Sequence, residues 1–146
     1  MGKNQEERFQ HEFIMKFGQT WPEYNHMLFE VNNNPKNEID GANRKSKGMK
    51  KSVSDLVFQI PIIGTFCGIE LKAPGSVWGK KKITPQLMWG LNTISNGGYF
   101  IMTSNRDLLM QFVTALVNQN FEVAKKIQTD AMDSIMIQMG GKTIKF

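Results

Sequence analysis

Three charged side chains lie in the two most strand-like stretches of the chain, SVSDLVFQI (residues 52–60) and TFCGIELKA (residues 65–73). Asp55 belongs to the first stretch, and Glu70 and Lys72 belong to the second. Because side chains at positions i and i+2 of a strand point to the same face, Glu70 and Lys72 share one face, about 6–7 Å apart. If the two stretches pair as an antiparallel hairpin, Asp55 reaches that face near Glu70.

Two carboxylates and an ammonium in this arrangement are suited to metal-assisted chemistry. A divalent cation between two carboxylates removes their mutual repulsion, and Mg²⁺ takes one or two carboxylates while keeping several waters. Such an ion polarises a phosphoryl oxygen and lowers the pKa of a bound water. Lys72 is placed to orient or deprotonate that water, or to stabilise charge on the phosphate. The alternative is an ordinary Glu70–Lys72 ion pair, because Glu-x-Lys triplets occur often by chance.

The elements that position these residues follow from hydrophobic periodicity and turn residues. Pro61 and Gly64, between the two charged strands, predict the hairpin. A first helix over residues 4–17 is predicted by apolar residues at helical spacing, namely Phe9, Phe13, Ile14 and Phe17. The other predicted elements are a strand at 26–31, a polar helix at 39–49, a helix at 85–95, a strand at 99–104, and helices at 105–118 and about 121–140. This order predicts one α/β domain around a central sheet.

Composition excludes several classes of protein. The single cysteine, Cys67, cannot form an intramolecular disulfide, and the same count excludes cysteine-rich zinc sites. His11 and His26 have no ligand spacing. No apolar run approaches the roughly 18 residues of a membrane helix, and the polar N-terminus MGKNQEERFQ lacks the apolar region of a signal peptide. We therefore expect a soluble, cytoplasmic protein without a membrane partner.

The net charge of +5 is concentrated in two basic clusters, RKSKGMKK before the first charged strand and KKK after the second. Such clusters suit a polyanion, because neutralised phosphates release condensed counterions. A solvated loop face is the alternative for either cluster alone, whereas two clusters flanking the charged strands favour nucleic acid. The candidate nucleic-acid contacts are Arg44, Lys45, Lys47, Lys50, Lys51, Lys80, Lys81 and Lys82.

Three segments, GMKKSVSDLVF, GIELKAPGS and TPQLMWGLNTISNGGYF, resemble the VRR-NUC family of the PD-(D/E)XK nuclease superfamily. That family has a Gly-x-Pro-Asp turn into a strand, a Glu-x-Lys strand, a Gln-x-x-Trp helix and a Gly-Tyr strand, in this order and spacing. The likeness runs from about residue 6 to about residue 104. The turn departs from the pattern, because it reads Ser52-Val53-Ser54-Asp55 here, which keeps the carboxylate but lacks the Gly and the Pro.

The resemblance implies a restriction-endonuclease-like (PD-(D/E)XK) core with a central mixed β-sheet flanked by helices. It implies that Asp55 and Glu70 bind Mg²⁺ or Mn²⁺ together with the backbone carbonyl of Leu71. Lys72 would then be the catalytic lysine. Gln86 corresponds to the family's helical glutamine beside the catalytic centre, although the residues alone would indicate an exposed polar position.

The family also has a glutamate on the first helix near the metal. Glu12 is the first choice for this third carboxylate and Glu7 the second, because the rotation of the helix is open. Either residue is otherwise a solvated helix charge. Trp89, one turn after Gln86, is expected to pack in the core rather than to stack on bases.

The expected function is a divalent-metal-dependent DNA endonuclease, selective for branched or junction DNA, in phage replication, recombination or DNA repair, inside a bacterial or phage-infected cell. A homodimer would present two active sites to a branched substrate. Residues 1–118 would form the nuclease domain, and residues 119–146 a helical tail that packs on the core or at a dimer interface. The alternatives are a catalytically inactive DNA-binding module with the same fold and a metal-free structural or interaction protein. Within the enzyme class, a sequence-specific restriction-type nuclease is also open.

Overall fold

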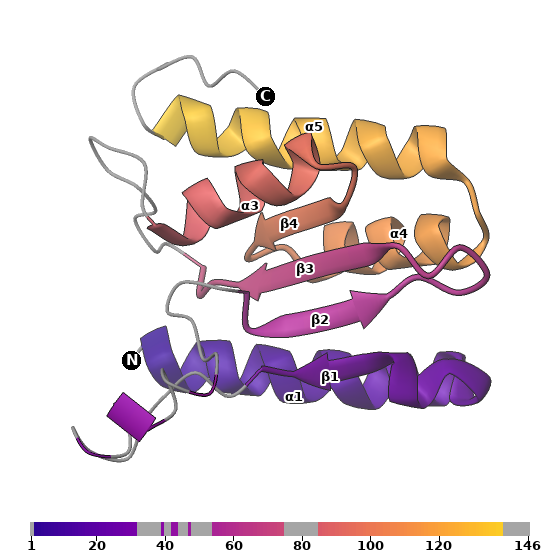
Figure 1. The fold of residues 1–146 in the computed structure, drawn as a ribbon, viewed down its shortest axis with the longest axis horizontal. Coiled ribbons are helices and arrows are strands. Elements are labelled where there is room, and N and C mark those ends of the chain that lie inside the picture. Colours follow the sequence, from indigo (N-terminus) through magenta and orange to yellow (C-terminus); the bar gives the residue numbers. More distant parts are fainter. Residues whose placement is uncertain are drawn as a thin grey trace.

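The computed structural model describes residues 2–31, 39, 42–43, 47, 54–74 and 85–138 (Figure 1). Its elements are α1 (Gly2–Thr20), the 3₁₀ helix η1 (Pro22–Met27), β1 (Leu28–Glu30), β2 (Leu56–Gln59), β3 (Phe66–Leu71), α3 (Pro85–Ser95), β4 (Tyr99–Thr103), α4 (Arg106–Val117) and α5 (Phe121–Gln138). None of these helices is long and apolar enough to cross a membrane.

Most predicted elements are confirmed, with boundaries shifted by a few residues. The strand expected at 26–31 is shorter, because η1 begins at Pro22 and extends to Met27, so that β1 starts only at Leu28. The polar helix expected at 39–49 lies mostly outside the described residues.

The four strands form one mixed sheet in the order β1-β2-β3-β4. The pairs β1–β2 and β2–β3 are antiparallel, and the pair β3–β4 is parallel. The hairpin predicted from Pro61 and Gly64 is therefore confirmed, and its register pairs Leu56 with Ile69. Parallel neighbours need a crossover connection, and α3 lies within the crossover from β3 to β4.

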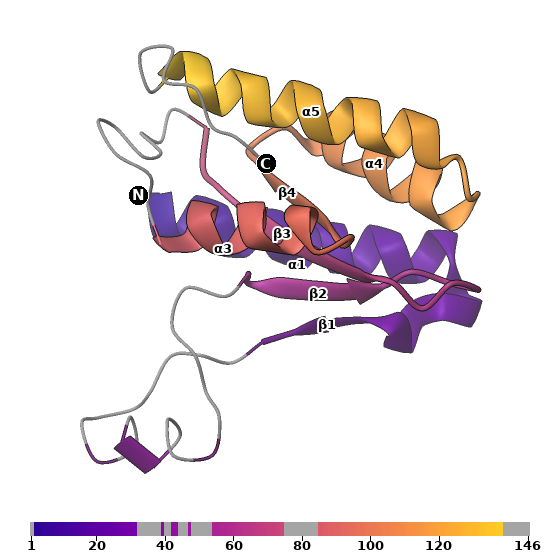
Figure 2. The same cartoon turned by 45° about the horizontal axis from the view of Figure 1, so that its top comes forward.

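Helices pack on both faces of the sheet, because side chains alternate between the faces along each strand. Cys67, Ile69 and Leu71 of β3 face a core that is completed by the apolar sides of α1 and α4. On the other face, Phe100 and Met102 of β4 pack with α3 and with the second half of α5. Figures 1 and 2 show that α3 and α5 lie on the β4 side of the sheet and do not cover β2.

The C-terminal helix α5 covers the outer edge of β4. The apolar residues that predicted this helix are all buried, namely Ala124, Ile127, Ala131 and Ile135. Gln128 also faces inward, and its Oε1 accepts a hydrogen bond from the Phe100 amide at 2.9 Å. This bond satisfies an N–H group at the sheet edge and so disfavours pairing with a further strand. This helix therefore packs on the core through its buried residues between Ala124 and Ile135.

Candidate active site

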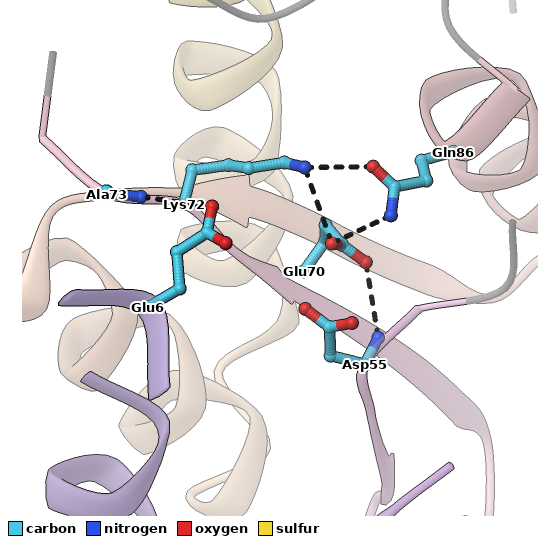
Figure 3. A network of polar contacts seen from close by, with 6 residues as sticks. All are labelled: Glu6, Asp55, Glu70, Lys72, Ala73 and Gln86. Carbon is cyan, nitrogen blue, oxygen red and sulfur yellow. Dashed lines mark hydrogen bonds and ion pairs between the residues drawn. The ribbon is translucent and has the colours of Figure 1, made fainter. Parts of the chain in front are cut away.

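Asp55 and Glu70 meet at the end of the β2–β3 hairpin opposite its turn (Figure 3). The register pairs Leu56 with Ile69, so the residue before β2 lies across from Glu70. The backbone amide of Asp55 donates to Oε1 of Glu70 at 3.2 Å. Glu70 is only 2% exposed, whereas Asp55 is half-buried. Antiparallel pairing therefore brings the two carboxyl groups together, as the strand pattern predicted.

The side-chain amide of Gln86 connects Glu70 to Lys72. Its Nε2 donates to Oε2 of Glu70 at 3.1 Å, and its Oε1 accepts from Nζ of Lys72 at 2.8 Å. The Lys72 ammonium also lies 3.6 Å from Oε2 of Glu70. The Lys72 ammonium can only donate, so it fixes the Gln86 Oε1 toward Lys72 and leaves Nε2 to donate to Glu70. The three side chains form one closed network.

Close packing of α3 on the sheet brings Gln86 to this network. Gly90 lies one turn after Gln86, and a Cβ at position 90 would overlap the ring of Phe100. A Cβ at Gly68 would likewise overlap the ring of Trp89. Trp89 packs between Phe66 and Phe100, with ring centroids 5.6 and 6.0 Å away. Trp89 is thus a partly buried residue that packs against the core, as expected, and the two glycines allow α3 to approach β3 and β4.

The environment of Glu70 disfavours its ionised form. Burial raises the pKa of this carboxyl group from 4.5 to about 8, and the negative charge of nearby Asp55 adds to the shift. Lys72 acts in the opposite direction but does not cancel these effects. Desolvation without a sufficient compensating charge favours the neutral acid. The surroundings of Asp55 and Glu70 therefore supply too little positive charge to favour the ionised form of Glu70.

The donor set suits a hard divalent cation. Asp55 and Glu70 offer carboxylate oxygens, and the Leu71 carbonyl is directed to the same side. The amide of Lys72 donates to the Thr103 carbonyl of β4 at 3.0 Å, and the C=O of a trans peptide points opposite to its N–H. The Leu71 carbonyl thus points away from β4, toward the Asp55 side. Mg²⁺ accepts such a set of oxygens together with waters.

The described part of the chain contains no group of three or more His, Cys, Asp or Glu residues arranged to hold a metal ion. Cys67 is fully buried, and burial raises the pKa of its thiol. His11 and His26 are exposed.

The structure does not bring Glu12 to the two carboxyl groups. Its Oε2 pairs with Nε of Arg106 at 2.7 Å, at the start of α4, and both side chains are about half exposed. Glu7 is exposed as well. The α1 residue that approaches the network is Glu6, whose Oε1 accepts from the Ala73 amide at 3.4 Å (Figure 3).

A signal for Glu6 was present in the sequence. The buried stripe of α1 runs through Phe9, Phe13 and Phe17, and position 6 extends it by one turn toward the N-terminus. Residues on one helix face recur at intervals of three and four. Glu12 lies outside this buried stripe, and its carboxylate pairs with Arg106 at the start of α4.

The candidate nucleic-acid contacts lie outside the described residues with one exception. Lys47 is described and is exposed. The cationic residues of the two basic clusters therefore remain predictions from the sequence.

Comparison of the chain with protein-family models, with curated proteins and with solved structures gave no significant match.

Proposed function

We propose that the chain is a divalent-metal-dependent DNA endonuclease with a PD-(D/E)XK core of the VRR-NUC kind. The observation that supports this function is the convergence of Asp55, Glu70, Lys72 and Gln86 in one set of contacts. An isolated structural ion pair would need Glu70 and Lys72 only. The additional carboxyl group directly precedes β2 and the bridging amide comes from α3. The resemblance assigns a role to each of the four residues.

In the proposed mechanism, Asp55, Glu70 and the Leu71 carbonyl would hold Mg²⁺ or Mn²⁺. The bound ion would supply polarisation of a phosphoryl oxygen and a bound water with a lowered pKa. Lys72 donates hydrogen bonds to the attacking water or to a phosphate oxygen, where it stabilises developing negative charge. Gln86 keeps Nζ of Lys72 and Oε2 of Glu70 in fixed positions, 2.8 and 3.1 Å from its own polar atoms.

DNA is the proposed substrate because basic clusters precede and follow the segment that carries Asp55, Glu70 and Lys72. Arg44 to Lys51 and Lys80 to Lys82 would contact phosphates and contribute a salt-dependent affinity. Branched or junction DNA, cut by a homodimer in phage replication, recombination or repair, is the preferred substrate class. Two sites related by a two-fold axis would act on two strands of such a branch.

A catalytically inactive DNA-binding module is the second candidate. It is favoured by the closed contact among Glu70, Lys72 and Gln86, in which the Lys72 ammonium lies 3.6 Å from Oε2 of Glu70 and partly supplies the charge that a metal would bring. Such a module would bind DNA equally well with and without a divalent cation and would not cleave it.

The test is a cleavage assay in Mg²⁺, Mn²⁺ or EDTA on labelled linear duplex, single-stranded, flap and four-way-junction DNA. We expect metal-dependent products, fastest on branched substrates, that vanish in Glu70→Ala. Asp130→Ala is the matched control, because it removes an exposed carboxylate whose partner is Lys126. Metal-independent binding without cleavage of any substrate would favour the inactive module.

A further inference from the structure

The side chain of Ser54, directly before Asp55, is buried although it is polar. Ser54 is 1% exposed, and its Oγ donates to the Leu56 carbonyl at 2.9 Å. A buried hydroxyl needs a hydrogen-bond partner, and this one finds it two residues further along the chain. The bond therefore closes a small ring of atoms that contains the whole backbone of Asp55.

This ring restricts the backbone dihedral angles of Asp55. Because β2 begins only at Leu56, Asp55 lies in the bend before the strand. Its carbonyl accepts from the Val31 amide at 3.0 Å. Its amide donates to Oε1 of Glu70 at 3.2 Å (Figure 3). Each of these two bonds holds one side of the residue, whereas the bond from Ser54 to Leu56 spans it. The rotamers open to a side chain depend on φ and ψ, so the ring also limits where the Asp55 carboxylate can lie.

The space for the Ser54 hydroxyl is provided by Gly68 on β3. A Cβ at position 68 would lie 2.9 Å from Oγ of Ser54 and 2.7 Å from the ring of Trp89. The hydroxyl and the indole ring thus fill the space that a larger residue at position 68 would need. Packing from β3 and α3 confines the hydroxyl, so the bond to the Leu56 carbonyl is shielded from competing water.

The Asp55 carboxylate needs such a restraint because Glu70 lies beside it. Two carboxyl groups at close range repel each other when both are ionised. Asp55 is only half-buried, so rotation of its side chain toward solvent would relieve this repulsion. The Ser54 bond replaces a bond to water and adds little to the stability of the whole chain. Its main effect is therefore on the local conformation.

We propose that Ser54 is a positioning residue, which holds the Asp55 carboxylate beside Glu70 before a metal ion binds. The inference rests on the proposed function, because it takes Asp55 as a metal ligand. The affinity for a ligand is reduced by the fraction of chains that lack the binding-competent conformation, so a restrained Asp55 binds the metal more tightly. The nuclease pattern that the turn resembles has a proline at this position, whose ring restricts the backbone covalently. Ser54 restricts it through a hydrogen bond instead.

Ser54→Ala tests this role, because alanine fits the site and lacks only the hydroxyl. The protection of the Asp55 amide against hydrogen exchange, measured by NMR in EDTA, should fall on the order of fivefold, as for the loss of one hydrogen bond. The dissociation constant for Mn²⁺ alone, measured by calorimetry, should rise by a similar factor. DNA cleavage should fall at low Mn²⁺ concentration and return to within about twofold of the parent rate at saturating Mn²⁺, because bound metal restores the competent conformation.

Two variants of α5 are the controls. Ser134→Ala removes the same atom from an exposed hydroxyl, which donates to the Asp130 carbonyl at 3.1 Å. Ile127→Val removes a buried methylene group and lowers the overall stability slightly. Both should leave the protection of the Asp55 amide and the affinity for Mn²⁺ unchanged. An equal loss in Ile127→Val and Ser54→Ala would mean that general destabilisation is the cause, and it would overturn the inference.

Two further results would overturn the inference. One is unchanged protection of the Asp55 amide in Ser54→Ala, and the other is a loss of protection that leaves the dissociation constant for Mn²⁺ unchanged. In either case a parent chain that binds Mn²⁺ and cleaves DNA would still be a nuclease. If the parent chain neither binds Mn²⁺ nor cleaves DNA, the proposed function fails. The exchange measurement then still decides whether Ser54 holds Asp55 beside Glu70, because the Asp55 amide is the group that contacts Glu70.

Discussion

The Gln86 side chain lies between Glu70 and Lys72, with its Nε2 3.1 Å from Oε2 of Glu70 and its Oε1 2.8 Å from Nζ of Lys72. Glu70 lies near the end of β3 and Lys72 directly follows that strand, so one residue separates them and each has its own rotamer freedom. Because the Gln86 amide accepts from Lys72 and donates to Glu70, it restricts the rotamers of both side chains. The relative position of the acid and the ammonium is therefore set by α3 as well as by β3.

Gln86→Leu should lower the rate of DNA cleavage about 10–100-fold, as is typical when a residue that orients a ligand is removed. Leucine has a similar size but neither accepts from Lys72 nor donates to Glu70. The rate is measured under single-turnover conditions on the best substrate of the cleavage assay. Metal affinity, measured by calorimetry, should weaken in parallel.

Asn92→Leu on the same helix is the control for Gln86→Leu, because Asn92 is exposed. It should cleave like the parent chain. Equal loss in both variants would mean that α3 was disturbed as a whole and that the Gln86 contacts are not the cause.

Lys72→Met should lower cleavage by about 10²–10⁴-fold, the usual contribution of a positioned proton donor or acceptor. Methionine keeps most of the stem but cannot hydrogen-bond a water or a phosphate oxygen. Circular dichroism and DNA binding in EDTA should be nearly unchanged, since Lys72 is a single cation among many. A Lys72→Met variant that cleaves at the parent rate would rule out its assigned role.

Glu6→Gln and Glu12→Gln should differ in their effect on metal affinity. Glu6 contacts the Ala73 amide beside the network, whereas Glu12 pairs with Arg106 on α4. We expect Glu6→Gln to weaken Mn²⁺ binding about tenfold. Glu12→Gln should change it by no more than about twofold, because it breaks only an exposed ion pair. The opposite order, measured by calorimetry, would restore Glu12 as the third carboxylate.

Much of the site could be predicted from local patterns. Strand alternation and the turn residues Pro61 and Gly64 predicted the hairpin, and the hairpin register alone places Asp55 across from Glu70. The period of the phenylalanines in α1 predicted its buried face. These features depend on interactions between near neighbours in the chain, so their signals are local.

Other features depend on tertiary packing and have no local signal. A polar residue on a predicted helix looks exposed, and only the approach of α3 to the sheet gives Gln86 its partners. Gln128 looks like a surface residue of α5, yet it is buried and caps the Phe100 amide. The positive φ of Ile62 was not predicted either, because its residue type disfavours that conformation.

The metal-free chain should lose stability as pH rises from about 4.5 to about 8 because of Glu70. In this window the unfolded chain has released the proton of Glu70, whereas the folded chain retains it. Folding is thus coupled to proton uptake, and stability falls by at most about 1.4 kcal/mol per pH unit. Urea denaturation in EDTA at a series of pH values measures this slope. Above pH 8 the slope from Glu70 should vanish.

Glu70→Gln is the control for the pH dependence. The amide keeps the shape of the acid but does not titrate, so the slope between pH 4.5 and 8 should decrease by the contribution of Glu70. An unchanged slope in this variant would show that Glu70 has an ordinary pKa in the folded chain.

Gly90→Ala should lower both stability and cleavage, because a Cβ at position 90 overlaps the ring of Phe100 and pushes α3 away from the sheet. Overpacking of this kind costs about 1–3 kcal/mol, and the displaced helix carries Gln86 away from Glu70. Phe100→Leu creates space at the same contact. Gly90→Ala should therefore cost less stability and less cleavage in the Phe100→Leu background than in the parent chain. Strictly additive effects in this cycle, measured by urea denaturation and single-turnover cleavage, would mean that the two positions are not coupled.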